Sequence, residues 1–174
     1  LDGLSVGDAF GQTFFGDDED ALERVNRRVA PGAPWYITDD SIMACAVVDI
    51  LDEYGGIDQA ALAKRFAAYY TTNPRRGYGG SAHQVLQALA RGEAWEDVSA
   101  NLFGGSGSYG NGAAMRVAPL GAYFADDLEL LRKNALRSAQ VTHFHQEGQI
   151  GALAVALAAA WAWRFRDDCC SGAE

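Results

Sequence analysis

The stretch TDDSIMACAVVDILDEY, residues 38–54, decides the fold class of this 174-residue chain. Its apolar positions recur at spacings of three and four, and they are Met43, Ala46, Val47, Ile50, Leu51 and Tyr54. This spacing is typical of the buried stripe of an amphipathic helix. Thr38 or Asp39 is the expected N-cap, because either side chain can accept a hydrogen bond from an exposed amide of the first turn.

The same helical period recurs in three more stripes: Leu62, Phe66 and Tyr69; Ala82, Val85, Leu86 and Leu89; and Leu128, Leu131, Ala135 and Leu136. Asp58 is the expected N-cap of the first. No stretch alternates β-branched or aromatic residues with polar ones, as strands do. We therefore predict an all-α fold in which residues 1–174 form a single domain, since no linker divides them. The run from Ile150 to Trp163 predicts a buried core helix and is too short to span a bilayer.

Charge and cysteine usage narrow the partners. The net charge of −9 argues against a general affinity for nucleic acid, because an acidic surface repels phosphate backbones. An anionic small ligand would need local positive potential from metal ions, helix N-termini or a few cations. Cys45 lies in an apolar helical pattern and is expected in the core, whereas Cys169 and Cys170 have neither disulfide-framework nor metal-ligand spacing. We expect a cytoplasmic protein with no membrane partner.

Three loops between the predicted helices are candidates for a site: Pro31–Asp40, Asn73–Gly80 and Gly104–Gly112. The last contains five glycines in nine residues. Glycine loses much conformational entropy on folding, so this density indicates that backbone amides approach another group closely.

The sequence Thr38-Asp39-Asp40-Ser41 has two interpretations. As a cap, its carboxylates stabilise the positive end of the helix dipole by about 0.3–1 kcal/mol each. As a binding site, its hydroxyl and carboxylate oxygens are the donors that Mg²⁺ prefers. The motif alone favours capping.

The loop Ser108-Tyr109-Gly110-Asn111-Gly112 leads into a predicted helix N-terminus, where exposed amides and the helix dipole favour an anion such as a diphosphate. It is not a P-loop, because no Gly-Lys-Ser/Thr follows, and no strand precedes it as in a Rossmann fold. A flexible connector is the alternative. Gly77-Tyr78-Gly79 belongs to a shorter loop of the same type.

Two further motifs are ambiguous. His143 and His145 form a His-x-His pair without a further Cys or His nearby, so we do not expect zinc. His143 is expected to hydrogen-bond either a ligand or a core partner. The small residues around Asp8, in Gly7-Asp8-Ala9-Phe10-Gly11, indicate close packing more than catalysis.

The order and spacing of these motifs resemble the ADP-ribosylglycohydrolase family. The resemblance rests on GDAFG (7–11), TDDS (38–41), RGYG (76–79), GSYGNGAAMRVAP (107–119) and TH (142–143). It extends from Leu1 to His145 and is closest to the branch with the serine-linkage hydrolase. The dinitrogenase reductase-activating glycohydrolase is a more distant likeness. The family is an orthogonal helical bundle with two Mg²⁺ ions in a cleft.

The resemblance assigns roles to individual residues. It implies that Thr38, Asp39 and Asp40 are metal ligands, with Asp39 and Asp40 as catalytic residues. The residues that it implies for ADP-ribose binding are Gly77, Tyr78, Gly79, Ser108, Tyr109, Gly110, Asn111, Gly112 and His143. The implied activity is magnesium-dependent hydrolysis of ADP-ribosyl bonds on protein side chains or small acceptors.

Three departures from the family pattern qualify this prediction. Ser41 replaces the usual Thr, and the family's second metal motif, Gly-Asp-Thr-Asp-Thr, is absent from residues 1–174. We therefore expect an N-terminal portion of the family domain, incomplete at its C-terminus. Phe15 stands where the family commonly has a flap Glu. The acidic residues 17–19 either substitute for that carboxylate or form a solvated run, and we favour the solvated run. A catalytically weak or inactive ADP-ribose-binding module is the alternative function.

Overall fold

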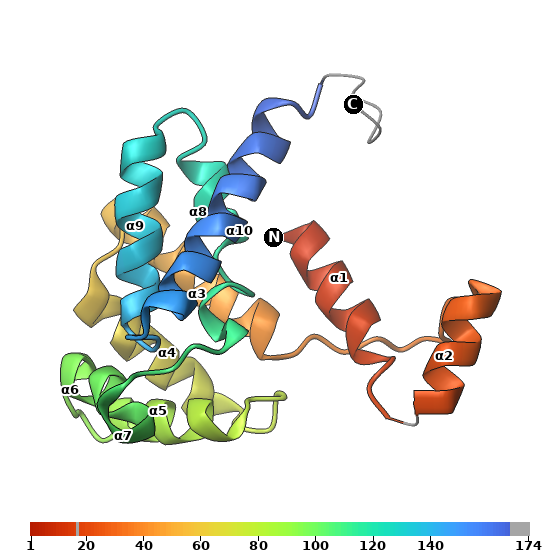
Figure 1. Ribbon diagram of the computed structural model, residues 1–174, viewed down its shortest axis with the longest axis horizontal. Coiled ribbons are helices and arrows are strands. Elements are labelled where there is room, and N and C mark those ends of the chain that lie inside the picture. The colour runs from red at the N-terminus through yellow and green to blue at the C-terminus, as the bar shows by residue number, and fades with distance from the viewer. Residues whose placement is uncertain (17, 168–174) are drawn as a thin grey trace.

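A computed structural model describes residues 1–16 and 18–167, and these residues form helices without any strand, which confirms the all-α prediction. The elements are α1 (Asp2–Gln12), α2 (Asp18–Arg27), α3 (Asp39–Tyr54), α4 (Gln59–Thr72), α5 (Gly80–Ala90), α6 (Trp95–Ala100), α7 (Leu102–Gly105), the 3₁₀ turn η1 (Asn111–Ala113), α8 (Ala118–Tyr123), α9 (Leu128–Gln140) and α10 (Gln146–Arg164). In Figure 1, α3, α8, α9 and α10 gather in a bundle, α5–α7 lie across one end of it, and α2 lies beyond α1 at the far side.

Helix α3 lies at the centre because its apolar stripe meets α4, α8 and α1. The predicted stripe is buried except at its last member, since Tyr54 is 52% exposed. The reason is local: Tyr54 is the final helical residue, and Gly55 ends the helix in the left-handed conformation, with φ 66°. Thr38 is the N-cap, and its side chain accepts a hydrogen bond from the amide of Asp40.

The other predicted helices are present in the structure as α4, α5 and α9. Asp58 caps α4 by accepting from the amide of Ala61 at 2.8 Å. The members of the predicted stripes that are buried are Leu62, Phe66, Val85, Leu86, Leu89, Leu131 and Ala135.

Cys45 is a free, half-buried thiol rather than a core residue, whereas Cys169 and Cys170 lie outside the described residues. The cytoplasmic location stays a prediction.

Helix α10 is not the fully buried helix that its composition predicts. It buries small residues four positions apart, Gly148, Ala152, Ala156 and Ala160, while Trp161 and Trp163 are about half exposed, at 49% and 47%. Small side chains let helix backbones approach closely: a Cβ on Gly121 of α8 would lie 2.2 Å from the carbonyl oxygen of Ala156. Within the described ranges, no helix has the length and apolarity needed to cross a bilayer.

Asp8 joins α1 to the start of α3. Its carboxylate accepts hydrogen bonds from the amide and hydroxyl of Thr38, at 2.8 and 2.6 Å, and from the amide and hydroxyl of Ser41, at 3.2 and 2.6 Å. Burial opposes ionisation of Asp8, but the hydrogen bonds from Ser41 and Thr38 outweigh it and lower the pKa. The small-residue motif therefore has a structural role, because it brings a carboxylate to the N-terminus of the central helix.

Substitution of this carboxylate tests its contribution to stability. We expect Asp8→Asn to lower the free energy of unfolding by about 1–3 kcal/mol, because the amide NH₂ group cannot accept from Thr38 or Ser41. The measurement is urea unfolding followed by circular dichroism. Asp2→Asn, an exposed change on the same helix, is the control, and equal losses in the two variants would contradict the role of Asp8.

Candidate functional site

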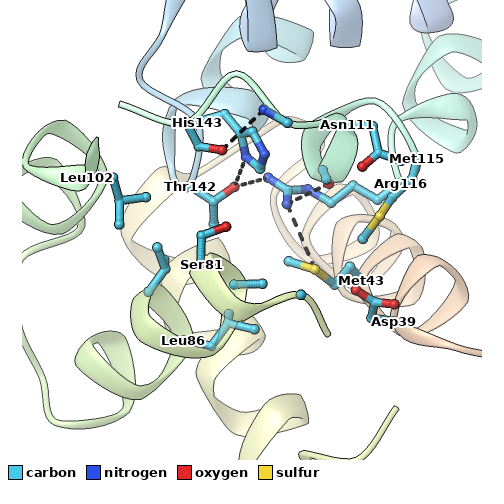
Figure 2. A pocket seen from close by; sticks show the side chains of 16 residues that line it. Asp39, Met43, Ser81, Leu86, Leu102, Asn111, Met115, Arg116, Thr142 and His143 are labelled. Atoms are coloured by element: carbon cyan, nitrogen blue, oxygen red, sulfur yellow. Dashed lines mark hydrogen bonds between the residues drawn. The ribbon is translucent and has the colours of Figure 1, made fainter. Parts of the chain in front are cut away.

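A pocket of about 130 Å³ lies where the three predicted loops meet. Asp39, Gly79 and Gly112 each come from a different loop, and all three line it. Figure 2 shows the polar side chains of Arg116, Thr142 and His143 grouped as a polar wall, with Met43 and Met115 beside Arg116. The apolar side chains of Leu86 and Leu102 also line the pocket. Whole small-molecule sites usually measure about 300–1,000 Å³, so this pocket accommodates one portion of a larger ligand.

Helix α5 begins at the edge of this pocket. Its N-cap is Gly79, and the side chain of Ser81 in its first turn lines the wall. Among the residues that the structure describes, no side chain caps this helix, so its first amides and the positive end of its dipole are available to an anion.

Two carboxylates at the start of α3 give the site its acidic side. Burial, together with the neighbouring charge of Asp40, raises the pKa of Asp39 to about 6. Burial and the charge of Asp8 also raise the pKa of Asp40. Gly77, at φ 91°, lets the second loop approach, since a Cβ there would lie 3.3 Å from Oδ1 of Asp39. Crowded, half-desolvated carboxylates of this kind are stabilised by a cation.

The fit of this acidic side to a metal is partial. Thr38, Asp39 and Asp40 supply hard oxygen donors, and Oγ1 of Thr38 lies 3.3 Å from Oδ2 of Asp40. In the part of the chain that the structure describes, no group of three or more His, Cys, Asp or Glu side chains is arranged to hold an ion. The three residues thus suit part of a coordination shell.

The glycine-rich loop packs tightly against the segment around His143. A Cβ on Gly112 would lie 2.9 Å from Cε1 of His143, and one on Gly107 would lie 2.6 Å from the amide nitrogen of His145. A Cβ on Gly110, by contrast, would make only ordinary contacts, 3.5 Å from Oγ of Ser108 and 3.8 Å from Nε2 of His143. Glycine at 107 and 112 is therefore required by internal packing, whereas a Cβ at the pocket-lining position 110 would be accommodated.

Arg116 is the one fully buried charge among the described residues. Its Nη1 donates to the carbonyl of Gly112 at 3.0 Å. Its Nη2 donates to the carbonyl of Ser138 and to Oγ1 of Thr142, each at 2.9 Å. The guanidinium also lies 4.4 Å from the ring centroid of Phe66. Burial lowers the pKa of Arg116 to about 9, so the side chain is still charged at neutral pH.

His143 lies on the polar wall beside this cation. Its Nδ1 is 2.8 Å from the hydroxyl of Thr142, and Figure 2 shows its ring between that hydroxyl and the glycine loop. Burial and the charge of Arg116 lower the pKa of His143 to about 3, which keeps the imidazole neutral.

Some expected ligand contacts lie outside the pocket lining. Tyr78 is buried in the core, with its ring against Tyr70 at 5.2 Å between centroids, and burial raises its pKa to about 12. Tyr109 is 68% exposed and packs edge-on against His145. The side chains of Thr38 and Asp40 adjoin Asp39 without lining the pocket. The residues that the structure brings together there are Asp39, Gly79, Ser108, Gly110, Asn111, Gly112 and His143.

Sequence reasoning gave no role to two residues of the polar wall, Arg116 and Thr142. Both stand inside quoted motifs, at the end of the GSYGNGAAMR string and immediately before His143. Arg116 also follows Gly112 by four positions, one helical turn, which was the available signal of a contact. The apolar lining residues Met43 and Leu86 were predicted only as members of the stripes of core helices.

Comparison with known proteins places the chain among its relatives. A family model described as ADP-ribosylglycohydrolase matches residues 1–173. ADP-ribosylhydrolase ARH3 of Homo sapiens is 36% identical over 173 residues, which cover 91% of this chain and 47% of that protein. ADP-ribosylhydrolase ARH3 of Mus musculus is 35% identical over 173 residues, with 91% and 46% covered. The chain thus spans about half the length of these relatives.

The raised pKa of Asp39 predicts a pH-dependent cost of folding. Between about pH 4 and pH 6 the folded chain holds a proton that the unfolded chain has released, so the free energy of unfolding falls as the pH rises. Asp39→Asn removes this titration. We expect the variant to gain about 1–3 kcal/mol over the parent between pH 4 and pH 7 without divalent cations, measured by urea unfolding. Asp52→Asn, exposed on the same helix, is the control, and parallel pH profiles for Asp39→Asn and the parent would refute the prediction.

The glycine geometry predicts opposite phenotypes for two neighbouring substitutions. Gly112→Ala forces a Cβ into the His143 ring and should lower the free energy of unfolding by about 1–3 kcal/mol. Gly110→Ala should change it by less than about 0.5 kcal/mol but weaken binding of ADP-ribose about tenfold or more, because the methyl group stands in the pocket. Thermal unfolding and calorimetric titration measure the two effects. Undiminished affinity in a stable Gly110→Ala variant would mean that the loop is only a connector.

Proposed function

Because this chain belongs to the ADP-ribosylglycohydrolase family, we propose that it carries the ligand loop and part of the metal site of a magnesium-dependent hydrolase. The proposed reaction is cleavage of ADP-ribosyl glycosidic bonds on protein side chains or small acceptors. The observation that supports it most is the shared pocket, in which the acidic start of α3 faces the loop of Ser108 to Gly112 and His143.

The ligand loop suits the diphosphate and ribose of ADP-ribose. Gly110 leaves space at the backbone, and the free N-terminus of α5 provides positive potential for an anion. The charge of Arg116 adds to that potential although its donors bind protein acceptors. An acidic protein of net charge −9 needs such local sources to bind an anion. The loop residues Tyr78 and Tyr109 are proposed to adjoin the ligand outside the pocket described above.

Thr38, Asp39 and Asp40 are the proposed ligands for Mg²⁺, of which we expect two ions in the complete site. Bound Mg²⁺ supplies a Lewis acid that orients oxygen ligands and stabilises negative charge. The fit rests on the donor set and on the raised pKa values of Asp39 and Asp40.

Asp39 and Asp40 are also the proposed catalytic residues. With a pKa of about 6, Asp39 is mostly ionised at neutral pH and is basic enough to orient a water molecule and accept its proton. The bond between the anomeric carbon and the acceptor breaks through an oxocarbenium-like transition state, the water oxygen bonds to that carbon, and the leaving acceptor gains a proton. The negative carboxylates stabilise the positive charge that develops on the sugar.

A catalytically weak ADP-ribose-binding module is the second candidate, and Phe15 is the residue that favours it. Phe15 is 81% exposed and lies between α1 and α2, outside the pocket lining. Its ring offers neither an acceptor nor a titratable proton where the family commonly has a flap Glu. Of the acidic run beside it, Asp17 lies outside the described residues, so the structure does not assign it to flap or solvent.

Calorimetric titration with ADP-ribose, with and without Mg²⁺, beside a turnover assay on an ADP-ribosylated peptide, tests the proposal. We expect Mg²⁺-enhanced binding in the full-length protein, and loss of that enhancement in Asp40→Asn. Absence of ADP-ribose binding under both conditions would refute the proposed function. Binding without turnover would favour the module.

Phe15→Glu separates the hydrolase from the module further. General acid–base help contributes about 10²–10⁴-fold in rate, so a restored carboxylate should raise turnover at least tenfold with little effect on affinity. Phe15→Gln is the matched control because it has the same length without the charge. A flat response in both would contradict the flap assignment of position 15.

A further inference from the structure

The hydroxyl of Thr142 lies between a group that only donates and a group that can accept. Nη2 of Arg116 donates to its oxygen at 2.9 Å, and a guanidinium has no acceptor. The remaining partner of this hydroxyl among the described residues is Nδ1 of His143, at 2.8 Å. Nδ1 is thus the one acceptor that the described residues offer to the Thr142 proton, and donation to Nδ1 is the arrangement that satisfies this hydroxyl within the protein.

A neutral imidazole that accepts at one nitrogen carries its proton on the other. His143 is neutral, because burial and the adjacent guanidinium both disfavour its protonated form. The proton of His143 is consequently on Nε2. This assignment rests on donor and acceptor identity at two short contacts, and the burial of the ring supports it.

Nε2 of His143 faces the pocket beside the glycine loop. It lies 3.2 Å from where a Cβ of Gly112 would be and 3.8 Å from where a Cβ of Gly110 would be. It has no protein partner within residues 1–16 and 18–167, and it is not among the buried side-chain nitrogens that are sealed from solvent. The Nε2–H group is thus open to a ligand.

We propose that Thr142, itself held by Arg116, is a positioning residue that fixes the His143 proton on Nε2 and so presents a hydrogen-bond donor to a ligand oxygen next to Gly110. The inference deepens the proposed function and depends on it for the identity of that ligand, ADP-ribose. The tautomer itself does not depend on the proposed function, because contacts within the protein set it without a ligand. The donor edge selects phosphate or ribose oxygens and rejects a ligand that presents an N–H donor at this point.

The tautomer can be measured directly by ¹H–¹⁵N correlation of the imidazole nitrogens in the ligand-free full chain. The chain has three histidines, so the signals of His143 can be assigned by their loss in His143→Gln. We expect a protonated Nε2 and a hydrogen-bonded, unprotonated Nδ1. A proton on Nδ1, or on both nitrogens, at pH 7 would overturn the proposal. This measurement needs no variant that disturbs the buried network.

A pair of substitutions at Thr142 then tests the positioning role. Thr142→Val removes the hydroxyl and should leave His143 as a mixture of tautomers, with affinity for ADP-ribose reduced about tenfold. Thr142→Ser restores the hydroxyl and should keep the Nε2–H form and affinity within about threefold of the parent. An unchanged tautomer and affinity in a folded Thr142→Val variant would overturn the positioning role. Failure of every variant and the parent to bind ADP-ribose would refute the proposed function but leave the tautomer result standing.

Discussion

The burial of the Arg116 guanidinium is the constraint on which the central part of this structure depends. Desolvating a charge costs several kcal/mol unless its donors are satisfied, and no carboxylate pairs with Arg116 among the described residues. Neutral acceptors replace it at Nη1 and Nη2, and they are the carbonyls of Gly112 and Ser138 and the hydroxyl of Thr142. The buried Nε has no partner among the described residues. Ser138 belongs to the last turn of α9, whose unpaired carbonyls form the negative end of the helix dipole. Because the planar guanidinium has fixed donor directions, its bonds to Gly112 and Ser138 set the position of the glycine loop relative to α9.

The buried Arg116 cation and the carboxylates at the start of α3 give the pocket two sides of opposite charge. On one side, burial raises the pKa values of Asp39 and Asp40, and the neighbouring charges of Asp40 and Asp8, respectively, add to this effect. On the other side, burial and the fixed cation lower the pKa of His143. A ligand with its diphosphate near Arg116, and with a cation shared between it and the carboxylates, would offset the charge on both sides of the pocket. The proposed metal and diphosphate ligand would therefore each be placed next to the side of the pocket that has the opposite charge.

The sequence predicted those features that depend on neighbouring residues in the chain. The stripe of α3 and the Asp58 cap follow from helical period and capping chemistry, and the structure has both. The glycine-rich loop differs from the prediction, because it contains the end of α7 and leads into the 3₁₀ turn η1 and not into an α-helix. Features that depend on distant packing were not predictable. The exposure of Trp161 on α10 depends on which face meets α8, and the burial of Tyr78 depends on Tyr70 from another helix. Glycine density likewise predicted close approach correctly, but only the folded chain shows that Gly112 approaches His143.

Two threonines illustrate why motif residues need their distant partners before a role can be assigned. Thr38 gives its hydroxyl proton to Asp8 across a 2.6 Å contact, which leaves its lone pairs directed to other groups, as a cation ligand requires. Thr142 accepts a hydrogen bond from Arg116, which leaves its own O–H group to donate to His143. A threonine hydroxyl next to a carboxylate, as at Thr38, is therefore left with its lone pairs as acceptors. A threonine hydroxyl next to a guanidinium, as at Thr142, is left with its proton to donate. Asp8 and Arg116 thus decide whether the neighbouring threonine hydroxyl donates or accepts hydrogen bonds at the site.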